Sequence, residues 1–154
     1  MISKKMQAIL LDSGATFYQD ALDVASLYES HPLDHALLIL LRTRYSKVPV
    51  LNDCEQLVGL IGIVDILNLA VDIEGLKPEK LKQRQVWEVM ETDYPKVLLG
   101  EPLEKILHLL VDQNFLAVVD EFGYFLGIIT RKSVLKSVNH LLHTVEKTYD
   151  LQAK

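Results

Sequence analysis

Apolar residues recur at helical spacing in two stretches of the chain, and each stretch follows a proline. Behind Pro32 and Pro102 the apolar side chains fall three or four residues apart, which predicts an amphipathic helix in each place. These positions are Leu33, Ala36, Leu37, Leu40 and Leu41 in the first stretch and Leu103, Ile106, Leu107 and Leu110 in the second. Proline suits the first turn of a helix, where its missing N–H has no partner to lose. We therefore expect a helix to begin at each proline.

Each predicted helix is followed by two short apolar runs that are separated by a turn. The first run of each pair, 48–51 and 116–119, leads into acidic or amide residues, which predicts a strand and a turn. The return strands are expected at 57–63 and 124–129, and each leads into another helix. A short strand before each proline, at 24–27 and at 97–99, completes a β-α-β-β-α unit in each half.

The two units align with each other as an internal repeat. Residues 45–52 lie over residues 113–120 at a shift of 68, which is 113 minus 45, and the same shift carries 57–62 onto 125–130. A shift that holds over several elements indicates one structural unit used twice. We expect the first unit with a leading helix at 12–72, a connector at 73–85, and the second unit with a C-terminal helix at 86–154.

The composition favours a soluble protein without a nucleic-acid or membrane partner. At 154 residues, with 49% hydrophobic and 24% charged residues, the chain is expected to form one compact unit. No apolar run approaches the roughly 20 residues that cross a bilayer, and the formal net charge of -5 lacks the basic excess of a nucleic-acid-binding protein. The single cysteine, Cys54, cannot form an internal disulfide, which fits a reducing compartment. We therefore expect a cytoplasmic protein.

Motifs for catalysis and for metal binding are weak in this sequence. His31 and His35, and likewise His140 and His143, have the spacing to share a helix face. Neither pair has a carboxylate partner at a spacing that would complete a metal site. The chain contains no GxxxxGKS or GxxxxGKT phosphate loop, no nucleophile elbow and no HExxH motif. We expect no catalytic residue, no metal ion and no cofactor.

The order of elements and the residues at their junctions resemble the CBS repeat, two of which form a Bateman module. Val48-Pro49-Val50-Leu51 precedes Gly59-Leu60-Ile61-Gly62 in the first copy, and the second copy ends its last strand in Thr130-Arg131-Lys132. The resemblance covers residues 24–135. It implies an α/β (α+β) fold, with two β-α-β-β-α repeats related by pseudo-two-fold symmetry. The same motifs are also similar to those of the small cyclic-di-AMP-binding CBS proteins of Firmicutes.

The resemblance implies a nucleotide cleft where the start of one repeat faces the final strand-helix junction of the other. The residues implied are Val24, Ala25, Tyr45, Ser46, Lys47, Pro49, Thr130, Arg131 and Lys132. An adenine ring needs an apolar slot, and cations at a helix start can hold a phosphate together with the first amides. Tyr45 fits either a stacking platform or a surface aromatic, and Arg131 and Lys132 fit either phosphate binding or solvated charge.

A second cleft is implied by the same symmetry and ranks below the first. It would join Val97, Phe115, Leu116 and Ala117 to Gly62 and Asp65. Asp65 stands where many CBS repeats carry the aspartate that holds ribose hydroxyls, but no cationic pair accompanies it. The chain also has Asp23 where the similar proteins lead us to expect a basic residue, and this carboxylate would repel a phosphate unless it turns away.

The resemblance implies a non-catalytic regulatory protein that senses cyclic di-AMP. It further implies a homodimer and a regulated protein partner, such as a (p)ppGpp synthetase/hydrolase or pyruvate carboxylase. Two alternatives stay open, namely a sensor of AMP, ATP or a similar adenosine ligand, and a structural interaction subunit with degenerate clefts. A titration with the three nucleotides separates these hypotheses.

Overall fold

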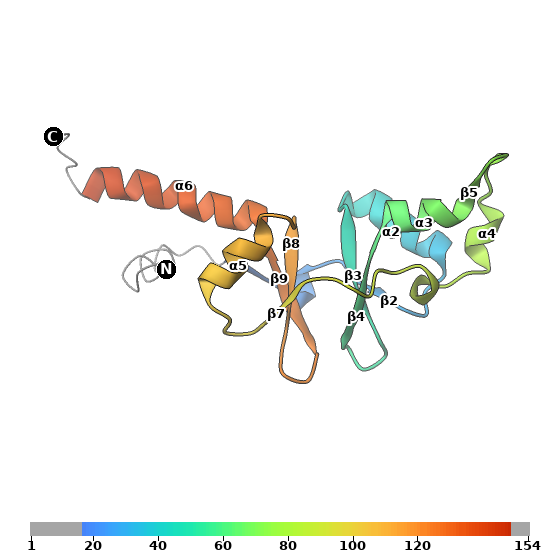
Figure 1. Cartoon of the computed structure of the whole chain (residues 1–154), viewed down its shortest axis with the longest axis horizontal. Coiled ribbons are helices and arrows are strands. Elements are labelled where there is room, and N and C mark those ends of the chain that lie inside the picture. Colours follow the sequence, from blue (N-terminus) through green and yellow to red (C-terminus); the bar gives the residue numbers. More distant parts are fainter. Residues whose placement is uncertain (1–16, 149–154) are drawn as a thin grey trace.

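The computed structural model describes residues 17–148, and two sheets meet at the centre of the molecule. Figure 1 shows the sheets facing each other, with the helices of each half lying on the outer side of its own sheet. A small third sheet of two strands lies in the connection between the halves. None of the helices described is long and apolar enough to span a membrane.

The first repeat forms the three-stranded sheet and two helices. Its elements are β2 (Leu27–Tyr28), α2 (Leu33–Thr43), β3 (Lys47–Leu51), β4 (Leu57–Gly62) and α3 (Ile63–Ala70). β3 lies in the middle, parallel to β2 and antiparallel to β4. Helix α2 buries Leu33, Ala36 and Leu40 against this sheet, which is the apolar stripe that its spacing predicts. Pro32 is the N-cap of α2, one residue before the first helical position.

The second repeat has the same order of elements. They are β7 (Lys96–Leu98), α5 (Leu103–Leu110), β8 (Phe115–Val119), β9 (Phe125–Thr130) and α6 (Arg131–Thr148). β8 lies parallel to β7 and antiparallel to β9. The two hairpins change register at matching places, after Val50 and after Val118, which are 68 residues apart (118 minus 50). The predicted fold class, a repeated β-α-β-β-α unit, is therefore confirmed.

A strand before the first repeat belongs to the sheet of the second. β1 (Tyr18–Asp20) pairs antiparallel with β9, so that Tyr18 lies opposite Ile129. The 3-10 helix η1 (Ala21–Asp23) follows, and the Val24 N–H donates to the Ala21 carbonyl at 3.2 Å. Residues 17–23 therefore do not form the leading helix that we expected, and residues 12–16 of that segment lie outside the described residues. Because Val24 ends η1, the next strand begins at Leu27 instead of at 24.

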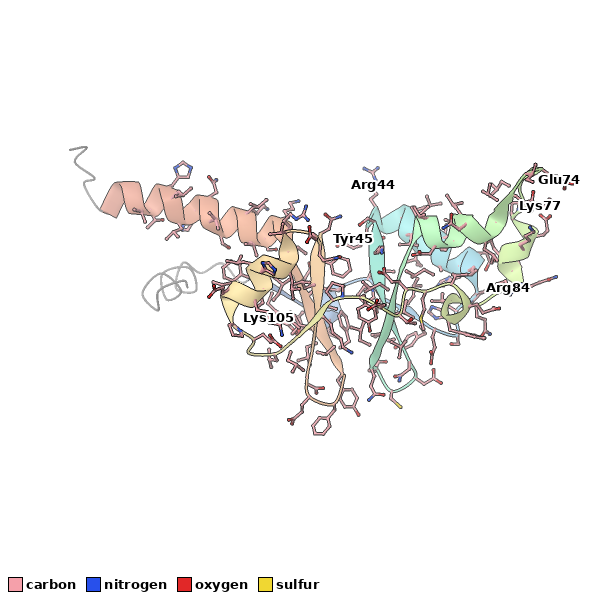
Figure 2. All side chains as sticks on the ribbon, viewed as in Figure 1. Arg44, Tyr45, Glu74, Lys77, Arg84 and Lys105 are labelled. Carbon is pink, nitrogen blue, oxygen red and sulfur yellow. The ribbon has the colours of Figure 1, made fainter. Side chains whose placement is uncertain are left out.

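Residues 71–88, which include the predicted connector 73–85, contain a hairpin that the sequence pattern did not reveal. The elements of this segment are β5 (Val71–Asp72), β6 (Gly75–Leu76), α4 (Glu79–Lys82) and η2 (Val86–Glu88). The Asp72 carboxylate lies 3.0 Å from the Lys77 ammonium and 3.1 Å from that of Lys80, which ties the hairpin to α4. Figure 2 shows Glu74 and Lys77 at the end of the molecule farthest from α6.

A shared hydrophobic cluster joins the two sheets. Leu51 and Leu57 of the first repeat pack with Val119 and Phe125 of the second. The two hairpin turns also exchange backbone hydrogen bonds, because the Leu57 N–H donates to the Gly123 carbonyl at 3.0 Å and the Phe125 N–H donates to the Glu55 carbonyl at 3.1 Å. These contacts join the two sheets at their hairpin turns, and the start of β3 and the end of β9, where the predicted cleft would lie, are at the opposite ends of the same strands.

Candidate functional site

A cavity of about 330 Å³ opens between the two repeats, and we call it the inter-repeat cleft. Eight of the nine residues predicted for the first nucleotide cleft line it, namely Val24, Ala25, Tyr45, Ser46, Lys47, Pro49, Thr130 and Lys132. The remaining lining residues are Gln19, Val48, Asn114, Phe115, Ile128 and Ser133. The cleft therefore receives side chains from β1, from both repeats and from the start of α6. Ligand binding by these residues stays a prediction.

The cleft has an apolar floor and a polar rim. Val24, Pro49 and Ile128 are buried, so they present a closed apolar surface to the cavity. Tyr45 is 44% exposed at the rim, and Figure 2 shows it on the side of the first repeat that faces the second. An apolar slot with polar groups at its mouth is the usual form of a site for a flat aromatic ligand.

The start of α6 forms one wall of the cleft. The Thr130 hydroxyl accepts a hydrogen bond from the Ser133 N–H at 3.0 Å and lies 2.6 Å from the Ser133 hydroxyl. Thr130 is thus a typical N-cap of this helix. Because the amides at a helix start carry partial positive charge, this wall favours an anion.

Arg131, the ninth predicted residue, does not line the inter-repeat cleft. Its guanidinium turns to the end of α5, where Nε donates to the Leu110 carbonyl and Nη2 donates to the Val111 carbonyl, each at 3.0 Å. The last carbonyls of a helix lack intrahelical partners, which is why they attract a cationic donor. Arg131 therefore links α5 to α6 and reaches a neighbouring surface.

That neighbouring surface is a shallow groove of about 570 Å³ along α6, which we call the α6 groove. It is lined by Asn114, Arg131, Lys132, Leu135, Lys136 and Asn139. Lys132, Leu135, Lys136 and Asn139 lie on one helix face, because their spacing is i, i+3, i+4 and i+7. Sequence reasoning missed the last three, although this spacing from Lys132 was the available signal.

The charge around the inter-repeat cleft is positive. Lys47 and Lys132 line it, and its lining residues include no carboxylate. Lys47 forms an ion pair with Glu91, whereas Lys132 forms none with any residue that the structure describes. Asp23, the carboxylate that would repel a phosphate, is exposed and does not line the cleft.

The second predicted cleft is only partly assembled. Gly62, Asp65 and Phe115 line a cavity of about 530 Å³, which we call the acidic cavity because Glu91 and Asp112 also line it. Val97, Leu116 and Ala117 are buried in the core and do not line this cavity. The Asp65 carboxylate accepts a hydrogen bond from the Gly62 N–H at 2.7 Å, so it caps α3. Three carboxylates beside one paired lysine disfavour a phosphate.

The histidines do not form a metal site within the described part of the chain. No group of three His, Cys, Asp or Glu side chains there has the geometry to hold a metal ion. The His31 and His35 rings stack edge to face with centroids 4.9 Å apart, and His31 Nδ1 accepts a hydrogen bond from the Tyr28 N–H at 3.2 Å. Burial, and secondarily the charge of His35, lower the pKa of His31 below its usual value.

The sequence and the fold both match known proteins along most of the chain. The family model for the CBS domain matches residues 20–72 and 86–140. Cyclic di-AMP receptor B of Bacillus subtilis (strain 168) is 35% identical over 147 residues, which are 96% of this chain and 100% of the relative. The 5'-AMP-activated protein kinase subunit gamma-3 of Homo sapiens is 31% identical over 122 residues, which are 75% of this chain and 24% of that subunit.

Two solved structures have a fold similar to that of this chain. CbpB of Streptococcus agalactiae is 33% identical with a TM-score of 0.86, and the match covers 99% of this chain and 96% of that one. CbpB of Listeria monocytogenes in complex with cyclic di-AMP is 38% identical with a TM-score of 0.78, over 88% of this chain and 98% of that one. The chain therefore belongs to the CBS-domain family, as a tandem pair of CBS domains.

Proposed function

We propose that the chain is a non-catalytic, cytoplasmic regulatory protein that binds cyclic di-AMP in the inter-repeat cleft. One observation carries the proposal, which is that the cleft combines an apolar floor with two lysines and no lining carboxylate. One adenine would occupy the apolar floor, and a phosphate would lie between Lys132 and the start of α6. The acidic cavity shares Ser46, Lys47, Asn114 and Phe115 with the cleft but adds three carboxylates, so the proposal places no phosphate there.

The relatives support the identity of the ligand. The Bacillus relative is named a cyclic di-AMP receptor, and the Listeria CbpB structure holds this nucleotide. Cyclic di-AMP carries two phosphodiester charges, which suits a cleft whose lining charges are all cationic.

Isothermal titration calorimetry with cyclic di-AMP, AMP and ATP at one salt concentration tests the proposal. We expect cyclic di-AMP to bind at least about tenfold more tightly than either mononucleotide, which is a difference of about 1.4 kcal/mol. Reverse-phase chromatography of the recovered nucleotide should show it unchanged. Tighter binding of AMP or ATP, or no binding of any of the three, would contradict the proposal.

The likeness to the kinase subunit gives the second candidate, a sensor of AMP or ATP. Its support is the match of 31% identity over 75% of this chain. In the same titration this candidate requires a mononucleotide to bind more tightly than cyclic di-AMP. A purely structural interaction subunit requires that none of the nucleotides bind.

We also propose that the chain forms a homodimer through its helices. Leu41 of α2, Val64 of α3 and Val111 after α5 are each more than half exposed, and a dimer formed through the helices would cover these apolar side chains. Light scattering should give about twice the chain mass of 17.5 kDa. A particle of 17.5 kDa at micromolar concentration would contradict the dimer.

The regulated partner is a protein whose affinity changes when the cleft fills. A (p)ppGpp synthetase/hydrolase and pyruvate carboxylase are the candidates, and a bound dianion beside α6 would alter the charge met by any protein docking there. Coupling of the usual size changes partner affinity about 5-fold to 150-fold, and the partner must change nucleotide affinity by the same factor. Interferometry with each immobilised candidate, with and without saturating cyclic di-AMP, measures this factor. Equal affinities in both conditions would leave a nucleotide-binding protein without a switch.

A further inference from the structure

The inter-repeat cleft is small for the ligand that the proposed function assigns to it. Its volume of about 330 Å³ lies at the lower end of the range of roughly 300–1,000 Å³ that pockets for compact ligands occupy. Cyclic di-AMP contains two adenosines and two phosphates, so it is twice a mononucleotide. If one half fills the cleft, the other half must lie on an adjoining surface.

The acidic cavity and the α6 groove both adjoin the cleft, and the α6 groove is the one lined by no carboxylate. Asn114 and Lys132 line both the groove and the cleft, so the two spaces lie side by side. From Lys132 to Asn139 the groove follows α6 for about 10 Å, which is seven residues at about 1.5 Å each. Figure 1 shows α6 running from the end of β9 outward beyond the sheet.

The chemistry of the groove matches half of a dinucleotide. Leu135 offers an apolar surface and is 61% exposed, and Lys136 follows it on the same helix face. The groove is lined by three cations, Arg131, Lys132 and Lys136, and by no carboxylate. Within the described residues Lys136 forms no ion pair. An amide such as that of Asn139 can both donate to and accept from an adenine edge.

We propose that the α6 groove holds the second nucleotide half of cyclic di-AMP and thereby selects the dinucleotide over AMP. This inference rests on the proposed function. Leu135 packs against the second adenine, Lys136 faces the second phosphate, and the Asn139 amide lies along the base edge. AMP fills only the inter-repeat cleft, so the groove contributes nothing to its binding.

Two groove variants and two matched controls test the assignment. Leu135→Ala is paired with Leu142→Ala, because Leu142 lies on the same helix, is 59% exposed and does not line the groove. Lys136→Glu is paired with Lys82→Glu, an exposed lysine of α4 at a distant place in the fold. Calorimetry gives the affinity for cyclic di-AMP, and ligand-observed NMR gives the weaker affinity for AMP. Light scattering of each variant reports the oligomeric state.

We expect each groove variant to lose at least about fivefold in affinity for cyclic di-AMP and to keep its AMP affinity within about twofold. The controls and Lys136→Arg should keep both affinities. Unchanged binding of cyclic di-AMP by the groove variants overturns the inference and leaves the proposed function intact. The same conclusion holds if binding is unchanged and the mass of Leu135→Ala shows that a second copy of the chain covers the groove. An equal loss of AMP affinity overturns the inference too, since the variants would then act through the fold. Failure of the unmodified protein to bind cyclic di-AMP overturns both proposals.

Discussion

Lys47 and Lys132 approach the inter-repeat cleft from different repeats, whereas Asp65, Glu91 and Asp112 surround the acidic cavity. The two cavities are related by the repeat, but substitutions at matching positions have given them opposite charge. Gly62 and Asp65 of the first repeat correspond to Thr130 and Ser133 of the second, at the shift of 68 (130 minus 62). Both pairs cap the following helix, and only the second leaves a wall without a carboxylate.

Among the residues that the structure describes, no carboxylate pairs with Lys132, whereas Lys47, the other lysine of the cleft, is paired with Glu91. Lys132→Ala should therefore lower the affinity for cyclic di-AMP by roughly tenfold, the lower end of the loss for a charge-assisted hydrogen bond, because this side chain is exposed. Calorimetry measures the loss, with Lys82→Ala as the control for removal of a distant charge. If Asp65→Ala lowers the affinity for cyclic di-AMP more than Lys132→Ala does, the acidic cavity is the binding site.

His31 makes the stability of the fold depend on pH. Its folded pKa is lowered by burial and by His35, so the unfolded chain binds the proton more readily than the folded chain does. The stability is therefore fully present above the unfolded pKa of about 6.5 and falls as the pH drops through that value. His31→Asn keeps a side-chain acceptor for the Tyr28 N–H and should lessen this fall. Urea unfolding at about pH 7.5 and 5.5 measures it, and equal losses in the two proteins would contradict the role of His31.

Most of the cleft was predictable at the residue scale because the resemblance to CBS repeats implies its lining, and the repeat alignment locates the strand ends where these residues lie. Val24, Lys47 and Thr130 all lie where the predicted elements begin or end. Arg131 was expected beside them, and its orientation depends on the carbonyls of Leu110 and Val111, whose position is set by the packing of α5 against β8 and α6. No spacing in the sequence encodes that contact.

At the scale of elements, β1 shows what a local pattern cannot reveal. Tyr18–Asp20 is too short for an alternating pattern, and its partner Phe125–Thr130 is distant in sequence. The β5–β6 hairpin escaped prediction for a similar reason, since its strands have two residues each. In contrast, α2 and the β3–β4 hairpin extend over enough residues for their periodicity to be read, and the structure confirms them.

The pairing of β1 with β9 depends on Gly127. A Cβ at this position would lie 2.1 Å from the Gln19 carbonyl oxygen and 2.7 Å from the Tyr18 ring. Gly127→Ala should therefore push β1 away from β9 and destabilise the fold by about 1–3 kcal/mol, the usual cost of overpacking. Chemical unfolding gives the loss, and amide exchange at Ile129 reports whether β1 has separated.

Gly59 provides the matched control for this prediction, because it occupies the same place in the first repeat (127 minus 59 is 68). The nearest neighbour of a Cβ there is the flexible Met90 side chain, whose sulfur would lie at 2.7 Å. The nearest backbone atom, the Glu91 carbonyl oxygen, would lie at 3.0 Å instead of 2.1 Å, so Gly59→Ala should cost less than Gly127→Ala because the thioether can move. Equal costs would show that the strand edge of β9 does not account for the effect.

At the scale of the whole molecule, the inter-repeat cleft is built from three separate parts of the chain. Gln19 comes from β1, Lys47 from the first repeat and Lys132 from the second. The hydrophobic cluster of Leu51, Val119 and their neighbours holds these parts together before any ligand arrives. A ligand in the cleft therefore contacts all three parts, and unfolding would separate them.

Cyclic di-AMP should accordingly stabilise the protein as one unit. At a free concentration of about one hundred times Kd, the gain is about 2.7 kcal/mol. For a chain of this size that gain corresponds to a rise in Tm of about 5–10 °C. Differential scanning calorimetry should show one transition that moves upward with ligand, and Lys132→Ala should move less at the same concentration. Two transitions, of which only one responds, would contradict the shared stability of the repeats.

The order in which the two sheets can assemble during synthesis follows from the position of β1. During translation Tyr18 leaves the ribosome long before its partner Ile129 is made, 111 residues later (129 minus 18). The sheet of β2, β3 and β4 can form before β1 has a partner, and β1 can pair only after β9 has left the ribosome. A chain that ends before Phe125 would lack β9 and leave β1 and β8 with unpaired edges, which invite aggregation and proteolysis. Pairing of β1 with β9 therefore occurs only in chains that contain β9, so truncated chains differ from longer ones in aggregation and proteolysis before any nucleotide binds.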